Sequence, residues 1–150
     1  MRGDLTARGR SLNQVIIMAS LIERETRGVE EKPVVAGIIY KRLESGWPLQ
    51  VDATLQYAIS NENCKNKIDN CTWWTPLIKE NMNINSPYNS YEIKGLPPTP
   101  IASPGLSSIK AAIYPEESGY WFYLHDPDGD IHFARTMEEH NDNIREYLGK

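Results

Sequence analysis

The chain has 150 residues, of which 40% are hydrophobic and 24% charged, and its formal net charge at pH 7 is -4. This length and composition fit a soluble globular domain that is large enough to bury a core. Nucleic-acid-binding proteins usually carry a clustered basic surface, and the sequence has no run of Lys and Arg interleaved with aromatic residues, which argues against that class. No stretch approaches the roughly 20 apolar residues that a membrane-spanning helix needs.

The first ten residues are polar and lack the apolar core of a signal peptide. The opening Met1-Arg2-Gly3 looks like an arbitrary beginning. We therefore expect residues 1–150 to form a single domain, taken from a longer protein.

The hydrophobic pattern predicts a helix over residues 12–27 that is apolar on most sides and therefore enclosed by other elements. Pro33 suits the first turn of a second helix, which should end near Gly46. Asp52 could cap a short third helix over residues 53–59. The apolar positions of the first helix that recur at helical spacing are Leu12, Val15, Met18, Ala19, Ile22 and Thr26.

The middle of the chain, residues 61–85, is polar and rich in Asn, which predicts a surface excursion with one short helix near 76–81. Residues 86–105 are rich in proline and predict a rigid, largely extended loop. A short helix should follow over residues 107–113 and end before Pro115.

Near the C-terminus, residues 120–124 and 130–134 read as two strands joined by a turn at Gly129. Thr136 then begins a last helix, and Glu139 completes a capping-box pattern with it. The predicted fold is therefore α+β: a mostly helical single domain with a small antiparallel sheet and a proline-rich extended loop.

Cys64 and Cys71 lie in the most polar part of the chain, whereas a buried structural cysteine usually has apolar neighbours. Two cysteines alone do not supply the four ligands that zinc prefers. We therefore favour a disulfide that closes a short loop over two free thiols. Because such bridges persist in oxidising compartments, the pair favours a location outside the cytoplasm.

Glu25 is the charged residue of the first helix that points most directly toward the core. On a helical wheel it lies roughly 50° from the centre of the apolar stripe, against about 110° for Glu23. A carboxyl held among apolar neighbours resists ionisation, and the resulting high pKa suits a general acid near neutral pH. The wheel alone leaves open that Glu25 merely pairs with a nearby arginine or lysine.

Residues 18–26, Met-Ala-Ser-Leu-Ile-Glu-Arg-Glu-Thr, are similar to the signature of the YceG-like (MltG) endolytic murein transglycosylases. Further similar segments follow in the family's order from about Leu12 to Leu148, which is far more specific than a single motif. They are Val35-Ala36-Gly37, Arg42-Leu43, residues 49–54, Tyr57, residues 86–91, residues 95–101, Pro104-Gly105, Ser108, Pro115, Tyr120, His132 and Glu139-His140-Asn141.

The resemblance implies cleavage of the bond between N-acetylmuramic acid and N-acetylglucosamine within nascent glycan strands. The muramic acid C6 hydroxyl, rather than water, would then close a 1,6-anhydro end. In the family the catalytic residue is the glutamate immediately before the threonine, which is Glu25 and not Glu23. One carboxyl can act first as general acid and then as general base, so a hydrolase's second carboxylate is not required.

Residues at other matching positions are candidates for substrate binding, through hydrogen bonds to sugar hydroxyls or acetamido groups. Glu31, shortly after the first helix, could instead orient the site or tune its charge. A helix-capping role for Asp52 and a packing role for the tyrosines remain open. His132 and His140 could brace the site. The candidate substrate-binding residues are Glu31, Gln50, Asp52, Thr54, Tyr88, Asn89 and Tyr91.

The sequence departs from the family's pattern at three positions: Thr99 replaces a common glycine, Lys32 an arginine and Lys41 an asparagine. These departures concern substrate positioning and not Glu25. For Trp73 and Trp74, in a region that varies in the family, packing is favoured over stacking on sugars.

No metal or cofactor is expected. Met137 stands where a calcium loop that began at Asp126 would need a glutamate, and a hairpin turn explains that segment better. Two other functions stay open. One is a hydrolytic muramidase in which Glu31 or Asp52 activates water, and the other is a catalytically silent peptidoglycan-binding module.

The resemblance further implies peptidoglycan glycan strands as the ligand and the glycan polymerases of the cell wall as possible partners. It places the parent protein at the outer face of the cytoplasmic membrane. The implied N-terminal membrane anchor would lie outside residues 1–150.

Overall fold

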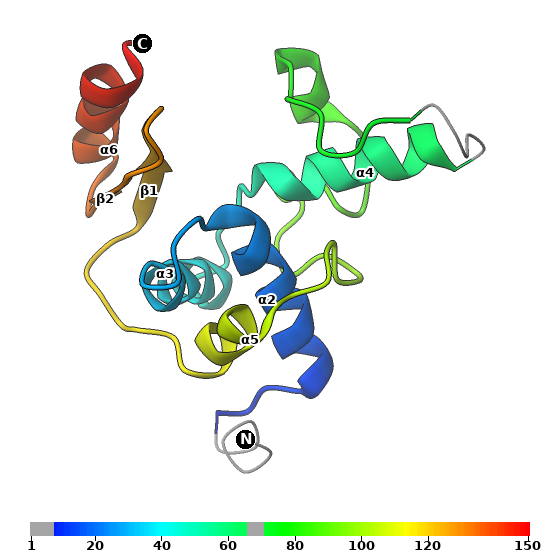
Figure 1. Cartoon of the computed structure of the whole chain (residues 1–150), viewed down its shortest axis with the longest axis horizontal. Coiled ribbons are helices and arrows are strands. Elements are labelled where there is room, and N and C mark those ends of the chain that lie inside the picture. The colour runs from blue at the N-terminus through cyan, green and yellow to red at the C-terminus, as the bar shows by residue number, and fades with distance from the viewer. Residues whose placement is uncertain (1–7, 66–70) are drawn as a thin grey trace.

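The computed structural model describes residues 8–65 and 71–150. These residues form an α+β fold of five α-helices, two shorter helices and a two-stranded antiparallel sheet, as the sequence predicts (Figure 1). The elements are α2 (Leu12–Glu25), α3 (Lys32–Glu44), α4 (Asp52–Cys64), the 3-10 helix η1 (Lys79–Asn83), α5 (Leu106–Ile113), β1 (Phe122–His125), β2 (Ile131–Ala134), α6 (Met137–Asn143) and the π-helical turn η2 (Ile144–Leu148).

The core lies where α2, α3 and α5 pack together. Four large apolar side chains of α2 are completely buried, which confirms that this helix is enclosed; they are Val15, Met18, Leu21 and Ile22. Burying each such side chain contributes about 1.5–3 kcal/mol to folding. Gly37 of α3 allows the backbone at Glu116 to come close, since a Cβ atom at residue 37 would lie 1.9 Å from the Glu116 carbonyl oxygen.

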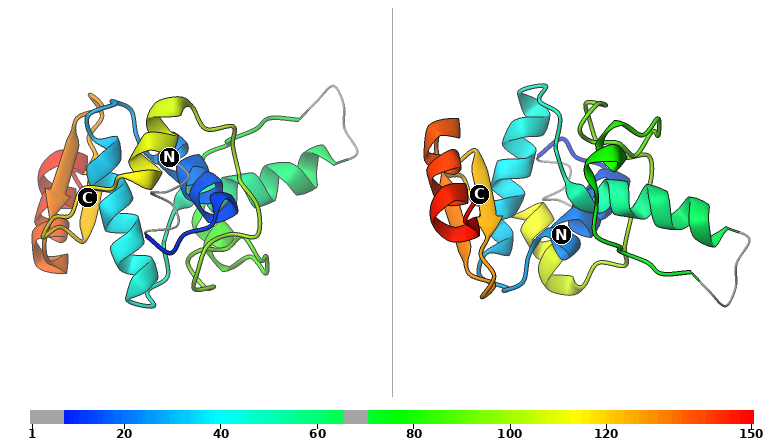
Figure 2. Two further views of the ribbon diagram at one scale, coloured as in Figure 1. Left: turned by 90° about the horizontal axis from the view of Figure 1, so that it is seen from below. Right: turned by 90° about the horizontal axis from the view of Figure 1, so that it is seen from above.

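The sheet and α6 lie on one side of this core, and α4 projects from the other side (Figures 1 and 2). In the sheet, Phe122 pairs with Ala134 and His125 with Ile131. The first turn of α4 and strand β1 nevertheless both come close to the C-terminal end of α2, because residues of all three elements line one pocket. This arrangement decides where a site can form.

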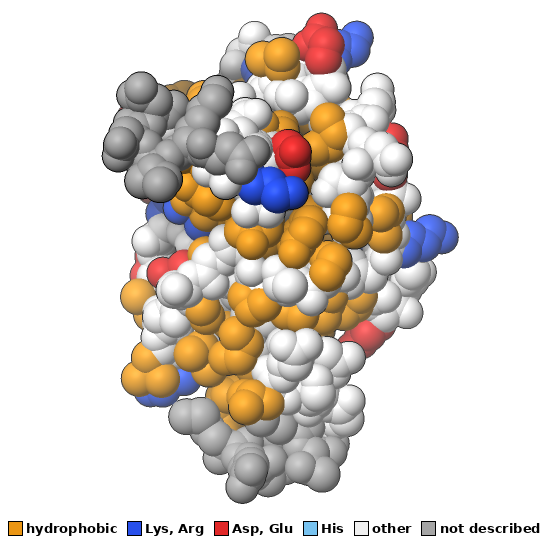
Figure 3. Space-filling view, turned by 90° about the vertical axis from the view of Figure 1, so that its right-hand side faces the viewer, with side chains coloured by type: hydrophobic (Ala, Val, Ile, Leu, Met, Phe, Trp, Pro, Cys, Tyr) orange, Lys and Arg blue, Asp and Glu red, His pale blue; other side chains and the backbone are white. Residues whose placement is uncertain are grey.

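The face from which α4 projects carries a broad band of hydrophobic side chains (Figure 3). On α4, the Tyr57 ring lies 5.8 Å from the Trp73 ring and 5.0 Å from the Tyr88 ring, between centroids. The Arg24 guanidinium lies 3.8 Å from the centre of the Trp74 ring. These contacts support packing as the role of both tryptophans.

Two helix boundaries differ from the prediction. α2 ends at Glu25 instead of residue 27, because Thr26 has extended backbone (φ −122°, ψ 152°) and both its N–H and its hydroxyl donate to the Ile22 carbonyl oxygen. α4 continues to Cys64 instead of residue 59, with exposed Asn and Glu in its last turn that hide the helical pattern. Asp52 is its first helical residue rather than its cap, which is Val51.

Two smaller predictions also need correction. The short helix expected near residues 76–81 lies at Lys79–Asn83. Thr136 does cap α6 by accepting the Glu139 N–H, but the Glu139 carboxylate accepts the N–H of Arg135 and not that of Thr136. The capping box is therefore half formed.

Cys64 and Cys71 form a disulfide with 5.3 Å between their Cα atoms, which confirms the favoured interpretation of the pair. Residues 66–70 of the predicted excursion and residues 1–7 lie outside the described part of the chain. Across the described ranges, no helix combines the length and the apolar character that crossing a membrane requires.

Candidate active site

The end of α2 places Glu25 in a pocket of about 320 Å³ between the first turn of α4 and strand β1. Several lining residues are exposed, so the pocket is open to solvent, while the Glu25 side chain is half-buried. Its lining residues are Glu25, Arg42, Gln50, Asp52, Tyr91, Phe122, Tyr123, Leu124, His125, Met137 and His140.

Burial raises the pKa of Glu25 from 4.5 to about 7. The Tyr123 hydroxyl donates to Glu25 Oε2 at 2.9 Å and opposes this rise, as does the backbone N–H of Ala53 in the first turn of α4. The negative charge of Asp52 adds to the rise, and the positive charge of Arg42 reduces it. Because desolvation prevails, Glu25 is about half protonated near neutral pH.

Arg42 is a buried cation that fixes the walls of the pocket. Its Nη1 donates to the Leu49 carbonyl oxygen at 2.9 Å, and its Nε and Nη2 donate to the Trp121 carbonyl oxygen at 3.0 and 2.7 Å. Since these donors are directed at carbonyl groups, the guanidinium acts on Glu25 through its charge and not through an ion pair. It also ties α3 to the start of the sheet.

Asp52 and Tyr91 form the polar wall opposite the sheet. The Tyr91 hydroxyl donates a hydrogen bond to Asp52 Oδ1. Burial first, and the Asp52 carboxylate second, raise the pKa of Tyr91 well above its usual value, so this phenol stays a hydrogen-bond donor. Asp52 thus lies beside Glu25 with one oxygen already engaged.

Glu31 lies behind the pocket and acts on it through His125. Glu31 Oε1 accepts the Arg27 N–H at 2.6 Å and lies 2.8 Å from His125 Nε2. His125 lines the Glu25 pocket, whereas Glu31 does not. Glu31 therefore orients the His125 ring from outside the pocket.

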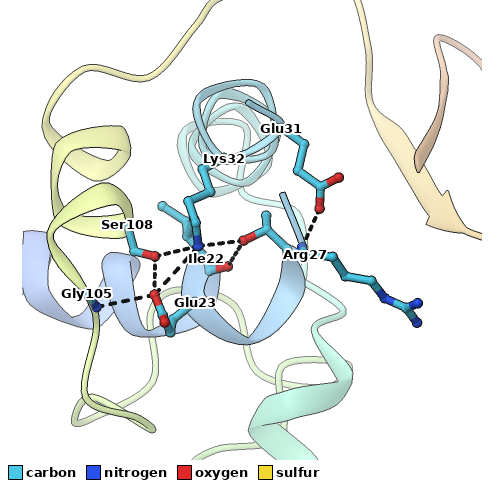
Figure 4. Close-up of polar contacts among 8 residues, drawn as sticks. Ile22, Glu23, Arg27, Glu31, Lys32, Gly105 and Ser108 are labelled. Atoms are coloured by element: carbon cyan, nitrogen blue, oxygen red, sulfur yellow. Dashed lines mark hydrogen bonds and ion pairs between the residues drawn. The ribbon is translucent and has the colours of Figure 1, made fainter. Parts of the chain in front are cut away.

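Glu23, by contrast, belongs to a polar cluster that joins α2 to α5 and α3 (Figure 4). Its carboxylate accepts from the Ser108 hydroxyl and from the Gly105 N–H at 3.3 Å, and lies 3.6 Å from Lys32 Nζ. Lys32 Nζ also donates to Thr26 Oγ1 at 3.0 Å and to Ser108 Oγ at 2.9 Å. The Ser108 hydrogen bond, more than any other contact, lowers the pKa of Glu23.

The sequence profile of the YceG-like family matches residues 2–146. The chain belongs to the YceG-like family. It is 34% identical over 138 residues to an endolytic murein transglycosylase of Bacillus subtilis, covering 92% of this chain and 35% of that protein. It is 30% identical over 139 residues to an endolytic murein transglycosylase of Streptococcus pneumoniae, covering 92% of this chain and 24% of that protein.

The crystal structure of a YceG-like protein from Listeria monocytogenes has the same fold, with a TM-score of 0.78 and 34% sequence identity. The match covers 94% of this chain and 43% of that one. The YceG-like chain described here thus spans between about a quarter and about a third of the length of the curated relatives it matches.

Of the residues expected to bind substrate in this YceG-like chain, Gln50, Asp52 and Tyr91 line the pocket. Thr54 is fully buried, and its hydroxyl bonds the Val51 carbonyl oxygen and Ser90 Oγ. Asn89 is also fully buried.

The Asn89 side-chain amide donates to the carbonyl oxygens of Met82 and Ile84, at 3.1 and 2.9 Å. The Tyr88 hydroxyl bonds Thr99 Oγ1 at 2.8 Å, and Tyr88 does not line the pocket. Asn89 and Tyr88, together with Thr54, hold the loops behind the Asp52 wall instead of facing the cavity.

Six pocket residues of the YceG-like site had no role in the sequence prediction, and the three polar ones among them are Arg42, Tyr123 and His125. The run of aromatic and apolar residues around Tyr123 predicted a strand, and nothing in it indicated a partner for Glu25. His140, which was expected to brace the site, lines the pocket and stacks on Phe122 at 5.1 Å between centroids. His132 lies outside the pocket, paired with Asp126 at 2.8 Å.

Proposed function

We propose that this YceG-like chain is the catalytic domain of an endolytic lytic transglycosylase that cleaves peptidoglycan within its glycan strands. The observation that carries the proposal is the half-buried Glu25 carboxyl, with a pKa of about 7, in an open pocket of about 320 Å³. A carboxyl that is partly protonated at neutral pH can donate a proton to a glycosidic oxygen. The names of the Bacillus and Streptococcus relatives support the same activity.

In the first step, protonated Glu25 gives its proton to the oxygen between N-acetylmuramic acid and N-acetylglucosamine, and the bond from that oxygen to the muramic acid C1 breaks. Positive charge develops on C1, where the nearby Asp52 carboxylate stabilises it electrostatically. In the second step, the muramic acid C6 oxygen bonds to C1, and the Glu25 carboxylate takes the hydroxyl proton. Glu25 ends as it began, and the product carries a 1,6-anhydro ring.

The other lining residues prepare Glu25 for both steps. Tyr123 holds the carboxyl in one orientation through its hydrogen bond to Oε2. The charge of Arg42 keeps the pKa of Glu25 from rising further, so that the carboxylate remains accessible for the second step. Gln50 and Tyr91 line the cavity with groups that can hydrogen-bond sugar hydroxyls or acetamido groups.

A hydrolytic muramidase is the nearest alternative, because Asp52 beside Glu25 gives a second carboxylate that could activate water. The two reactions leave different ends on the glycan. Mass spectrometry of digested peptidoglycan should show 1,6-anhydro-muramic acid ends. Reducing muramic acid ends would instead support hydrolysis and overturn the transglycosylase proposal.

A catalytically silent peptidoglycan-binding module is the other alternative. Glu25→Gln preserves the size of the side chain and its ability to accept from Tyr123, but it cannot exchange a proton. We expect the wild type to release fragments from purified glycan and the variant to release none, with both binding the glycan. If neither releases fragments although both bind, the chain is a binding module.

We also propose that the parent protein works at the outer face of the cytoplasmic membrane, near the glycan polymerases that make its substrate. The Cys64–Cys71 disulfide supports an oxidising compartment. Digestion of this domain by a protease added outside intact protoplasts would support that location, and complete protection would contradict it.

A further inference from the structure

A second hollow, of about 380 Å³, lies next to the Glu25 pocket along the sheet. It is largely apolar and is bounded by Trp47, Trp121 and the start of α6. The two hollows are adjacent, because three residues line both of them: Gln50, Phe122 and Met137. Each hollow is at the lower end of the roughly 300–1,000 Å³ typical of ligand sites.

Two tryptophans form the wall of this second hollow. The ring centroids of Trp47 and Trp121 are 4.6 Å apart at an interplanar angle of 31°, and 41% of Trp47 is exposed to solvent. Large apolar groups exposed on a surface commonly mark binding sites. The exposed aromatic surface beside the polar pocket is therefore a candidate for one.

Both tryptophans are held in place through Arg42. The Trp47 N–H donates to the Arg42 carbonyl oxygen at 2.9 Å, and the Trp121 carbonyl oxygen accepts hydrogen bonds from Nε and Nη2 of Arg42. The Trp121 N–H donates to the Ala134 carbonyl oxygen at 2.9 Å. The aromatic wall is therefore positioned by the same residue that shapes the Glu25 pocket.

Gln50 lies at the junction of the two hollows in a left-handed backbone conformation, with φ of 55°. Left-handed backbone is costly for a residue other than glycine, and such strain gathers at binding sites. A hydrogen bond from the Gln50 N–H to the Ser90 carbonyl oxygen, at 3.0 Å, holds it there. Among residues 8–65 and 71–150, none hydrogen-bonds the exposed Gln50 side-chain amide, which leaves it free for a ligand.

We infer that Trp47 and Trp121 form a sugar-binding subsite for the N-acetylhexosamine ring next to the one whose bond is cleaved. A pyranose ring has apolar C–H faces that pack on an aromatic ring, and polar edges that need donors and acceptors such as the Gln50 amide. The inference rests on the proposed function. It goes further by assigning a second sugar of the strand to a defined wall of the cleft.

The test is glycan binding to the Glu25→Gln protein, so that no cleavage intervenes. Isothermal titration calorimetry with peptide-free glycan strands should give a dissociation constant about tenfold weaker for Trp47→Ala. Trp47→Phe, which keeps a flat ring, should recover most of the affinity. Trp73→Ala is the matched control, because Trp73 is also 41% exposed but packs beside Tyr57, away from the cleft. It should bind within twofold of the parent.

Parent-like binding by Trp47→Ala would overturn the subsite and leave the proposed function standing. Equal losses in Trp47→Ala and Trp73→Ala would also overturn it, because the effect would not be local. If Trp47→Ala weakened binding of the free stem peptide but not of the glycan, the occupant would be peptide and the inference would be wrong. Failure of the parent to bind any glycan would overturn the proposed function as well.

Discussion

Glu23 and Glu25 lie in the last turn of the same helix, yet their surroundings shift their pKa values in opposite directions. Glu23 faces α5, where the hydroxyl of Ser108, the N–H of Gly105 and the ammonium of Lys32 surround its carboxylate and lower its pKa. Glu25 faces the pocket, where burial prevails and raises its pKa to about 7. Two residues advance a helix by about 200°, which turns the two carboxyls to different sides.

A different physical effect prevails at each carboxyl. Around Glu23, hydrogen bonds, above all that of Ser108, and a cation together outweigh the cost of desolvation, so the ionised group stabilises the contact between helices. Around Glu25, one phenol and one backbone N–H do not offset burial, and the nearest cation, Arg42, is directed at carbonyl oxygens. One end of α2 thus carries both a structural acid, Glu23, and the acid that we propose to be catalytic, Glu25.

The largest expected effect is on catalytic rate, when Glu25 and Glu23 are each replaced by glutamine. We expect Glu25→Gln to lower kcat on purified glycan by about 10³-fold, because general acid–base catalysis typically contributes 10²–10⁴-fold. Glu23→Gln should lower it by less than about tenfold, since it removes no proton donor from the pocket. Release of soluble fragments from labelled glycan measures both. Similar losses for the two variants would contradict the separation of roles.

The same two variants should change stability in opposite directions. In the unfolded chain Glu25 ionises near 4.5, but in the folded protein it keeps its proton up to a pKa of about 7. Folding is therefore penalised as the pH rises between these values, by up to about 3 kcal/mol above pH 7. Glu25→Gln should remove the penalty: urea unfolding should show it more stable than wild type at pH 8 and similar to it at pH 4.

For Glu23 the sign is reversed, because its pKa is lowered on folding. Its stabilising effect is present above its unfolded pKa and is lost as the pH falls through its folded pKa. Glu23→Gln should therefore be less stable than wild type at pH 7, and the difference should shrink in acid.

A Glu25→Gln protein that was less stable than wild type at pH 8 would show that burial does not dominate at Glu25.

Much of the fold was predictable because its patterns are local. The enclosed character of α2 follows from its apolar residues, and the orientation of Glu25 toward the core follows from the helical wheel. The end of α2 was not predictable in the same way. Thr26 leaves the helix while Lys32, six residues on, donates to its hydroxyl. That contact depends on how α3 folds back.

The site was less predictable for two reasons. Its main contacts join residues that are distant in sequence, and the type of a polar residue does not reveal whether it faces the cavity. Tyr123 donates a hydrogen bond to Glu25, which is 98 residues away in sequence. The pattern that predicts a strand around Tyr123 does not indicate that partner. Thr54 and Asn89 were expected to bind sugars, and in the structure they bond the protein's own backbone. A polar residue in a motif looks the same in sequence whether it faces a ligand or supports a loop.

Ser108 offers a test of the Glu23 side alone. Ser108→Ala removes the hydroxyl that donates to Glu23 and accepts from Lys32 in a fully buried position. The loss should cost about 1.5–3 kcal/mol of unfolding free energy at pH 7, which is typical of a hydrogen bond to charged groups. In the Glu23→Gln background the cost should be smaller, since the two residues interact. An unchanged cost in that background would show that they do not.

Tyr123 offers the corresponding test of the Glu25 side, through pH dependence. With the acid required in its protonated form, kcat/KM should fall tenfold per pH unit above the pKa of Glu25, which is about 7. The Tyr123 hydroxyl lowers that pKa, so Tyr123→Phe should move the alkaline limb to higher pH by about 0.7 of a unit, the equivalent of one hydrogen bond of about 1 kcal/mol. Tyr88→Phe, which loses a hydroxyl hydrogen-bonded to Thr99 outside the pocket, should leave the position of the alkaline limb unchanged. A shift to lower pH in Tyr123→Phe would mean that the phenol favours the protonated acid, and the balance of forces assigned to Glu25 would have to be reversed.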